Sequence, residues 1–188
     1  MRIDTLKLIA GIFLGCSLLI WTHNAGAAED DPKADPVAVY AELDGEWTGE
    51  FVGWDTSGRE LYRIEVHQSY ETVDSTTQKV SIRDRAADGT VTLGTGRNVA
   101  RRLEDGSLEL RCIVEKSNGE RVEHAGRLVE GPSGASELVW HSQGEGNEEI
   151  FRERVLRENG EEIYAIDGLG RYGETLILMA GRYRRVAE

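Results

Sequence analysis

The side chains most suited to catalysis or metal binding are scattered along this chain. His67, His124 and His141 lie far apart, without the His-x-His or His-x-x-x-His spacing that places two ligands on one strand or helical turn. Gly-x-Ser-x-Gly and Cys-x-x-Cys, the motifs of a hydrolase elbow and a thiol redox site, do not occur. We therefore expect these histidines to be surface or core residues, and we expect no metal site, no cofactor and no catalytic residue.

Carboxyl groups are numerous, and two pairs are adjacent, at 148–149 and 161–162. Paired acids can hydrolyse glycosides, but on an acidic chain solvated outer positions and strand ends explain them better. Cys112 lies in the apolar alternation of LELRCIV, which favours a small buried hydrophobic side chain over a nucleophile.

Mid-strand arginines offer another chemistry. An inward arginine would bind an anionic ligand group with two parallel hydrogen bonds, whereas an outward one would pair with Glu109, Glu123 or Glu153 on neighbouring strands. We favour outward positions, because burying a charge is costly. The arginines concerned are Arg111, Arg127, Arg152 and Arg154.

Turn signals at short intervals define the elements that would hold these side chains. Asp-Gly and Asn-Gly pairs supply the positive φ angles of tight hairpin turns. Nine such signals separate ten segments: 55–58, 73–76, those ending at Gly89, Gly106 and Gly119, 131–134, 144–146, the one ending at Gly160, and GLGRYG at 168–173.

The segments between the turns alternate as strands do. SLELRCIV and ELYRIEV each place apolar side chains on one face and charged ones on the other, whereas ETLILMAGRY is apolar on both faces, as for a strand covered on both sides. The other segments are about 46–54, 75–85, 90–101, 121–130, 136–142, 147–157 and 161–167.

Consecutive hairpins make each strand the partner of the next, and closing the sheet removes its two exposed edges. We predict an all-β fold: a ten-stranded antiparallel up-and-down β-barrel over residues 37–188. A short helix precedes it in PVAVYAEL, with Asp35 as N-cap and Pro36 at the first helical position.

The N-terminus has the layout of an export signal. Arg2 and Lys7 precede the apolar run of residues 8–21, and Ala25 and Ala27 give the small-x-small cleavage pattern. We predict a signal peptide over 1–27, a flexible acidic leader over 28–36, and a periplasmic or extracellular location. The alternatives are a lipoprotein through Cys16 and an uncleaved anchor.

Charge and length limit the partners. The 188-residue chain has a net charge of −12, and removing residues 1–27 makes it −13. Such a protein repels nucleic acid and anionic lipid headgroups, so we expect neither as a partner, and no membrane contact beyond the signal peptide. Cys112 is then the one remaining cysteine, so no intrachain disulfide can form.

Both ends of the predicted barrel resemble the calycin superfamily, which includes lipocalins, fatty-acid-binding proteins and bacterial calycin-like barrels of unknown function. GEWTGEFVG at 45–53 carries Gly-x-Trp on a first strand after a short helix, and GRYRRV at 181–186 is similar to the Tyr-x-Arg ending of the last strand. The resemblance implies a barrel floor in which Trp47 meets Arg185, with Arg182 and Arg184 as alternatives. The haem-binding members ligate iron through a late-strand histidine, and 161–186 contains none.

The resulting functional hypothesis is an exported, non-enzymatic binding protein whose barrel holds a small apolar or amphipathic molecule. A ligand-free structural or interaction barrel, and an enzyme with its site at the barrel mouth, are the alternatives; several converging titratable groups would favour the enzyme. The candidate ligand-binding residues are Trp47, Phe51, Tyr62, Leu110, Trp140, Met179 and Tyr183.

Overall fold

The computed structural model describes residues 35–131, 134–144 and 147–187. The predicted signal peptide and all but the last two residues of the predicted leader lie outside this range. Within it, no helix is both long enough and apolar enough to cross a membrane.

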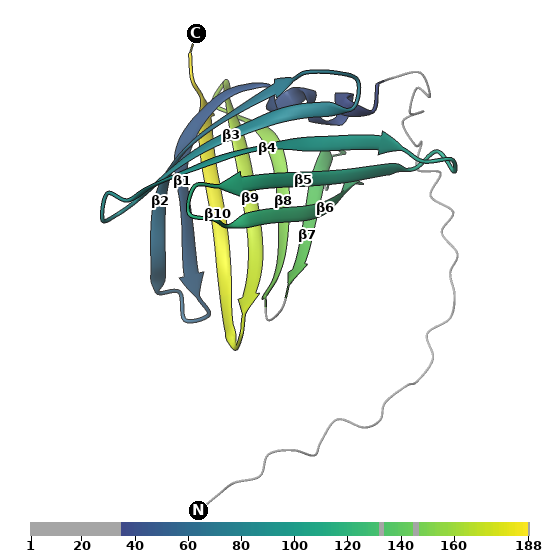
Figure 1. Cartoon of the computed structure of the whole chain (residues 1–188). Helices are drawn as coiled ribbons and strands as arrows, with labels where there is room; N and C mark the ends of the chain where they lie inside the picture. Colours follow the sequence, from purple (N-terminus) through teal and green to yellow (C-terminus); the bar gives the residue numbers. More distant parts are fainter. Residues whose placement is uncertain (1–34, 132–133, 145–146, 188) are drawn as a thin grey trace, which may run out of the picture. The chain divides into compact units, whose positions relative to one another are not determined.

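The described chain forms one short helix and ten antiparallel strands that close into a barrel (Figure 1). This confirms the predicted all-β, ten-stranded up-and-down barrel with a short helix before it. The elements are the 3₁₀ helix η1 (Pro36–Leu43), β1 (Gly45–Asp55), β2 (Glu60–Thr72), β3 (Thr77–Ala86), β4 (Val91–Arg102), β5 (Leu108–Lys116), β6 (Arg121–Glu130), β7 (Ser136–Gly144), β8 (Asn147–Glu158), β9 (Glu161–Tyr172) and β10 (Thr175–Arg185).

Closure brings the two ends of the sheet together. β1 pairs with β10 from Trp47 opposite Arg185 to Asp55 opposite Ile177, and every other pairing joins neighbours in the sequence. Because side chains alternate along a strand, one face of each strand points into the barrel and the other points outward. The register therefore decides which charged residues reach the interior.

Two sequence predictions about the last strands are wrong. GLGRYG was predicted as a turn, but β9 runs on to Tyr172. Gly168 and Gly170 face inward there, where a Cβ atom would collide with the Phe151 and Tyr172 rings, so these glycines make room for cavity side chains. The segment ETLILMAGRY was predicted to be covered on both faces, but Leu178 on its outer face is 48% exposed.

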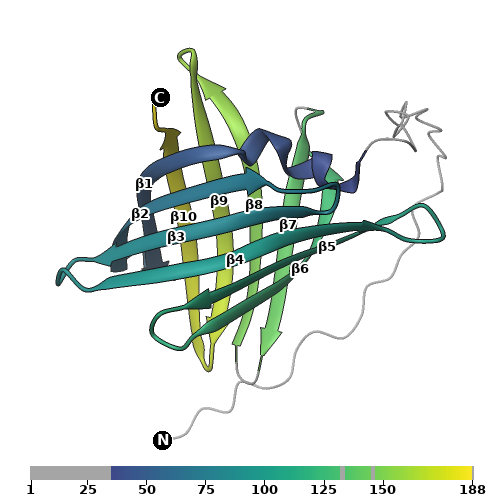
Figure 2. The same cartoon turned by 45° about the horizontal axis from the view of Figure 1, so that its top comes forward.

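Helix η1 closes one end of the barrel, here called the floor (Figure 2). Its Val37, Tyr40 and Leu43 are buried. The Tyr40 hydroxyl donates to the Val99 carbonyl at 3.0 Å, and the Trp47 indole donates to the Leu43 carbonyl at 2.7 Å. These contacts fix the helix across the start of β1. The opposite end, here called the mouth, is formed by the hairpins that join β1 to β2, β3 to β4, β5 to β6 and β9 to β10.

An apolar row crosses the outer face near the mouth. In register, Trp54 on β1 lies opposite Leu178 on β10, Leu178 opposite Leu169 on β9, and Leu169 opposite Ile150 on β8. Leu178, Leu169 and Ile150 are 37–48% exposed. The outer surface is thus not uniformly charged, despite the acidic composition.

Candidate functional site

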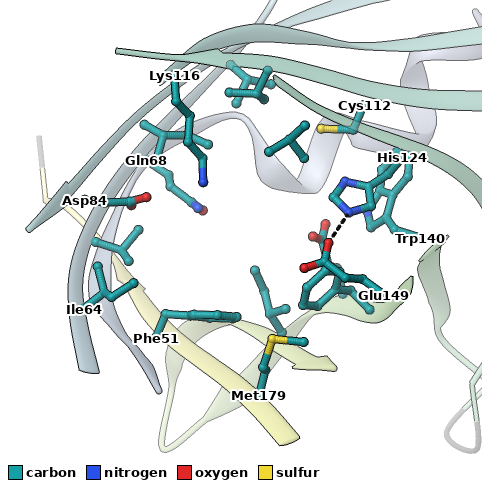
Figure 3. Close-up of a pocket in the computed structure, with 18 of the residues that line it drawn as sticks. Phe51, Ile64, Gln68, Asp84, Cys112, Lys116, His124, Trp140, Glu149 and Met179 are labelled. Carbon is teal, nitrogen blue, oxygen red and sulfur yellow. Dashed lines mark hydrogen bonds and ion pairs between the residues drawn. The ribbon is translucent and has the colours of Figure 1, made fainter. Parts of the chain in front are cut away.

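A cavity of about 360 Å³ occupies the barrel interior between the floor and the mouth (Figure 3). Its volume falls in the range of small-molecule sites. Aromatic and aliphatic side chains from most of the strands form much of the wall: Phe51, Tyr62, Ile64, Val66, Tyr70, Val80, Ile82, Val114, Val122, Trp140, Phe151, Tyr164, Ile166, Tyr172, Met179 and Tyr183.

The structure places five of the seven candidate ligand-binding residues in this wall: Phe51, Tyr62, Trp140, Met179 and Tyr183. Trp47 and Leu110 are fully buried outside it. Trp47 lies in the floor, where the Arg185 guanidinium is 4.2 Å from the centre of its ring. Arg182 and Arg184, the alternative partners, lie on the outer face and pair with Asp167 and Glu161. A contact with ligand remains a prediction for all seven.

A hydrogen-bonded cluster of polar side chains reaches the cavity from β6, β7, β8 and β9. Glu149 Oε2 lies 3.2 Å from His124 Nε2 and accepts from the Ser142 hydroxyl at 3.2 Å, while Glu149 Oε1 accepts from the Tyr172 hydroxyl. The bond to His124 is the main cause that lowers the pKa of Glu149. Glu149 is therefore an ionised carboxylate held by three donors. The sequence predicts an outer, solvated position for it, which is wrong.

Glu153 lies four residues further along β8, on the same face and deeper in the barrel than Glu149. Burial raises the pKa of its carboxyl, and hydrogen bonds from Trp140 and Tyr164 act in the opposite direction. The sequence interpretation as an outward partner for arginines is wrong here too. Strand alternation contained the signal, because outward Arg152 and Arg154 require Glu153 to point inward.

Charged groups at the mouth come from β3, β5 and the β5–β6 hairpin. Lys116 Nζ lies 3.1 Å from a Glu120 carboxylate oxygen. Asp84 points into the same part of the cavity (Figure 3), where burial raises the pKa of its carboxyl and the charge of Lys116 opposes that rise. The mouth therefore combines acids and one lysine.

Cys112 also lines the cavity. Burial, with a smaller effect of the Glu153 charge, raises the pKa of its thiol to about 12. A thiol at this pKa is almost entirely protonated near neutral pH, so it is a poor nucleophile. This agrees with its interpretation as a small apolar side chain.

The other candidate groups lie on the outer face. Arg111 pairs with Glu123 at 3.5 Å, and Arg152 with Glu137 at 3.3 Å. Arg154 bridges Glu137 and Asp167. These outward positions agree with the prediction; Arg127 is likewise exposed on β6.

The remaining histidines and paired glutamates lie beside local polar partners. His67 and His141 are about half exposed beside Glu46 and Glu148. Glu162 pairs with Arg185 at the floor, at 2.7 Å. In the described part of the chain, no group of three or more histidine, cysteine or acidic side chains could hold a metal ion.

Comparison with known proteins supports the fold and nothing finer. No protein-family model matches this sequence, and no curated protein sequence matches it. The S-type phycobiliprotein lyase CPES from Guillardia theta aligns over 84% of this chain and 96% of its own, with 7% identity and a TM-score of 0.52.

Two further solved structures align with lower TM-scores. Rv2717c from M. tuberculosis covers 82% of this chain and 99% of its own at 14% identity, with a TM-score of 0.42. A de novo designed fluorescence-activating β-barrel covers 80% and 98% at 16% identity, with a TM-score of 0.37. The alignment with the phycobiliprotein lyase shows a similar fold, and no sequence relationship assigns a family.

Proposed function

We propose that this barrel is a binding protein that holds a small apolar or amphipathic molecule in its cavity. The observation that carries the proposal is the cavity itself, about 360 Å³ in volume and walled by aromatic and aliphatic side chains. A barrel whose interior is filled by its own side chains offers no such space. A mixed wall with a few polar groups is typical of a ligand site.

The test is a fluorescence titration with N-phenyl-1-naphthylamine, a neutral aromatic dye that brightens in apolar surroundings. We expect one saturable site per chain. Val122→Trp should abolish it, because Val122 faces the cavity and the larger ring would fill the space. Ala125→Trp, on the same strand but exposed on the outer face, is the matched control and should bind like wild type. Equal binding by the two variants would reject the cavity as the site.

The His124–Glu149–Tyr172 cluster supports a second candidate, an enzyme that uses acid–base chemistry at the barrel mouth. A carboxylate that orients an imidazole is a general-base arrangement, and the sequence did not indicate it. Hydrolysis of p-nitrophenyl acetate by wild type and His124→Gln tests this candidate. A loss of about 100-fold or more in rate would favour it. If wild type and His124→Gln both hydrolyse the ester at the background rate, simple binding is favoured.

We further propose that the chain is a calycin-like barrel exported from the cytoplasm. The support is the layout of residues 1–27, the Gly-x-Trp of β1 and the contact between Trp47 and Arg185. N-terminal sequencing of the protein from its native host should find a start near Ala28. A lipid-modified start at Cys16 would establish a lipoprotein instead.

A further inference from the structure

Among the acidic groups that line the cavity, Glu153 and Asp84 have no ion-pair partner within the described ranges, and Glu153 lies deeper in the barrel than Asp84. Glu149 is hydrogen-bonded to His124, Ser142 and Tyr172, and Glu120 pairs with Lys116. Among the ion pairs of the described residues, none involves Glu153. Its hydrogen-bonding neighbours, Trp140 and Tyr164, are neutral donors.

The surroundings of Glu153 are mainly aromatic. Its charge raises the pKa of groups from five elements, namely Tyr40 of η1, Tyr70 of β2, Cys112 of β5, Tyr164 of β9 and Tyr183 of β10, and the charge of His124 on β6 lowers the pKa of Glu153 itself. A buried carboxylate with no ion-pair partner in contact is expensive, so this side chain lowers the stability of the barrel. A carboxylate beside aromatic rings is also the combination that holds organic cations, by charge pairing and by cation–π attraction.

A second buried acceptor lies in the cavity wall. Gln78 donates to the Tyr40 carbonyl and to Asp44, both at 2.9 Å, so its side-chain oxygen is left to accept from Asn98 Nδ2, also at 2.9 Å. That arrangement fixes the orientation of the Asn98 amide. Asn98 is 3% exposed and lines the cavity, and its Oδ1 accepts no hydrogen bond from the described residues. The wall of the inner cavity thus contains a buried acceptor that no described residue satisfies.

Charge outside the cavity favours the same kind of ligand. The chain carries a net charge of −12, and Asp84 and Glu120 flank a single lysine at the mouth. The acids at the mouth outnumber the lysine, and a net negative charge at a cleft raises the local concentration of cations. The field therefore attracts cations toward the barrel.

We propose that the molecule held in the cavity is an organic cation, a compact aromatic or aliphatic body with one protonated amine that pairs with Glu153. This rests on the proposed binding function and names the class of its ligand. The rings around Glu153 receive the body, and the N–H groups of the amine reach Glu153.

Three indoles of almost equal size separate charge from shape: tryptamine (a cation), tryptophol (neutral) and indole-3-acetate (an anion). Each competes against N-phenyl-1-naphthylamine on the full-length protein at neutral pH. We expect tryptamine to bind about tenfold or more tightly than tryptophol, as for a hydrogen bond to a charged group, and indole-3-acetate to bind most weakly. Glu153→Gln should bind tryptamine no better than tryptophol. Glu123→Gln removes the same charge from the outer face and should keep the preference.

The outcomes separate the two proposals. If the dye binds saturably but wild type does not prefer tryptamine, the organic cation is rejected and the binding function stands; this result needs no variant. If a folded Glu153→Gln keeps the preference, the role of Glu153 is rejected. If neither the dye nor any indole binds, both proposals are rejected.

Discussion

Replacing Trp47 with alanine should cost this barrel a large share of its stability. The side chain is 0% exposed, and its ring centre lies 5.6 Å from that of Tyr164. Removing a buried tryptophan costs about 3–5 kcal/mol through lost burial and the cavity left behind. The Leu43 carbonyl also loses its donor. We therefore expect the upper part of that range.

Arg185 supports the same floor from the other side of the β1–β10 pairing. Its guanidinium stacks on Trp47 and donates to Glu162 at 2.7 Å, to the Glu42 carbonyl at 3.0 Å and to the Asp44 carbonyl. The side chain is 35% exposed, so solvent weakens these contacts. Arg185→Ala should cost about 1–2 kcal/mol.

The decisive measurement is the coupling between these two side chains. Urea denaturation of wild type, Trp47→Ala, Arg185→Ala and the double variant, followed by circular dichroism, should give a double-variant loss about 1 kcal/mol smaller than the sum of the single losses. Trp54→Ala is the control, because Trp54 lies on the outer face and should cost less than Trp47. The floor explanation fails if Trp47→Ala is as stable as wild type or if the two losses simply add.

Three further predictions follow from groups inside the barrel. Burial raises the pKa of Glu153 above its value in the unfolded chain, so the stability of the protein falls as the pH rises from the unfolded-state pKa through the folded-state pKa. Glu153→Gln should therefore match the Tm of wild type near pH 4 and exceed it near pH 8. A lower Tm of the variant near pH 8 would contradict the reasoning. Cys112 should react with Ellman's reagent far more slowly in the folded protein than in guanidinium chloride near pH 8, because its pKa is about 12; equally fast labelling would refute this. Haemin should give no saturable Soret band, because β9 and β10 carry no histidine and the His124 imidazole is held by Glu149; a one-to-one complex lost in His124→Ala would overturn that prediction.

The strand order could be predicted because this sequence marks nearly every hairpin with a turn signal. Nine turns, with one alternating segment between each turn and the next, make a closed meander the simplest arrangement of the strands. The error at 168–173 has a physical cause: Gly168 and Gly170 read as turn residues, yet they serve as space for neighbouring rings inside the barrel. Glycine has both uses, and only the three-dimensional packing distinguishes them.

The polar side of the cavity was harder to predict because β8 carries apolar and charged residues on both faces. Phe151 and Val155 share one face with Glu149 and Glu153, and Ile150 and Leu156 share the other with arginines, so hydrophobicity does not identify the inner face. The free-energy cost of burying a charge correctly predicted that the arginines point outward. The same reasoning placed Glu149 and Glu153 outside, although alternation requires them to face inward.

The pairing of β1 with β10 has a consequence for how the barrel folds. Every other strand pair joins neighbours through a short hairpin, whereas this one brings Trp47 to Arg185 across nearly the whole described chain. Closing so long a loop costs more chain entropy than closing a hairpin. The contacts between β1 and β10 offset this cost only after the two strands have met. We therefore expect the hairpins to assemble first and ring closure to limit the folding rate, which makes the contact between Trp47 and Arg185 the last part of the native structure to form.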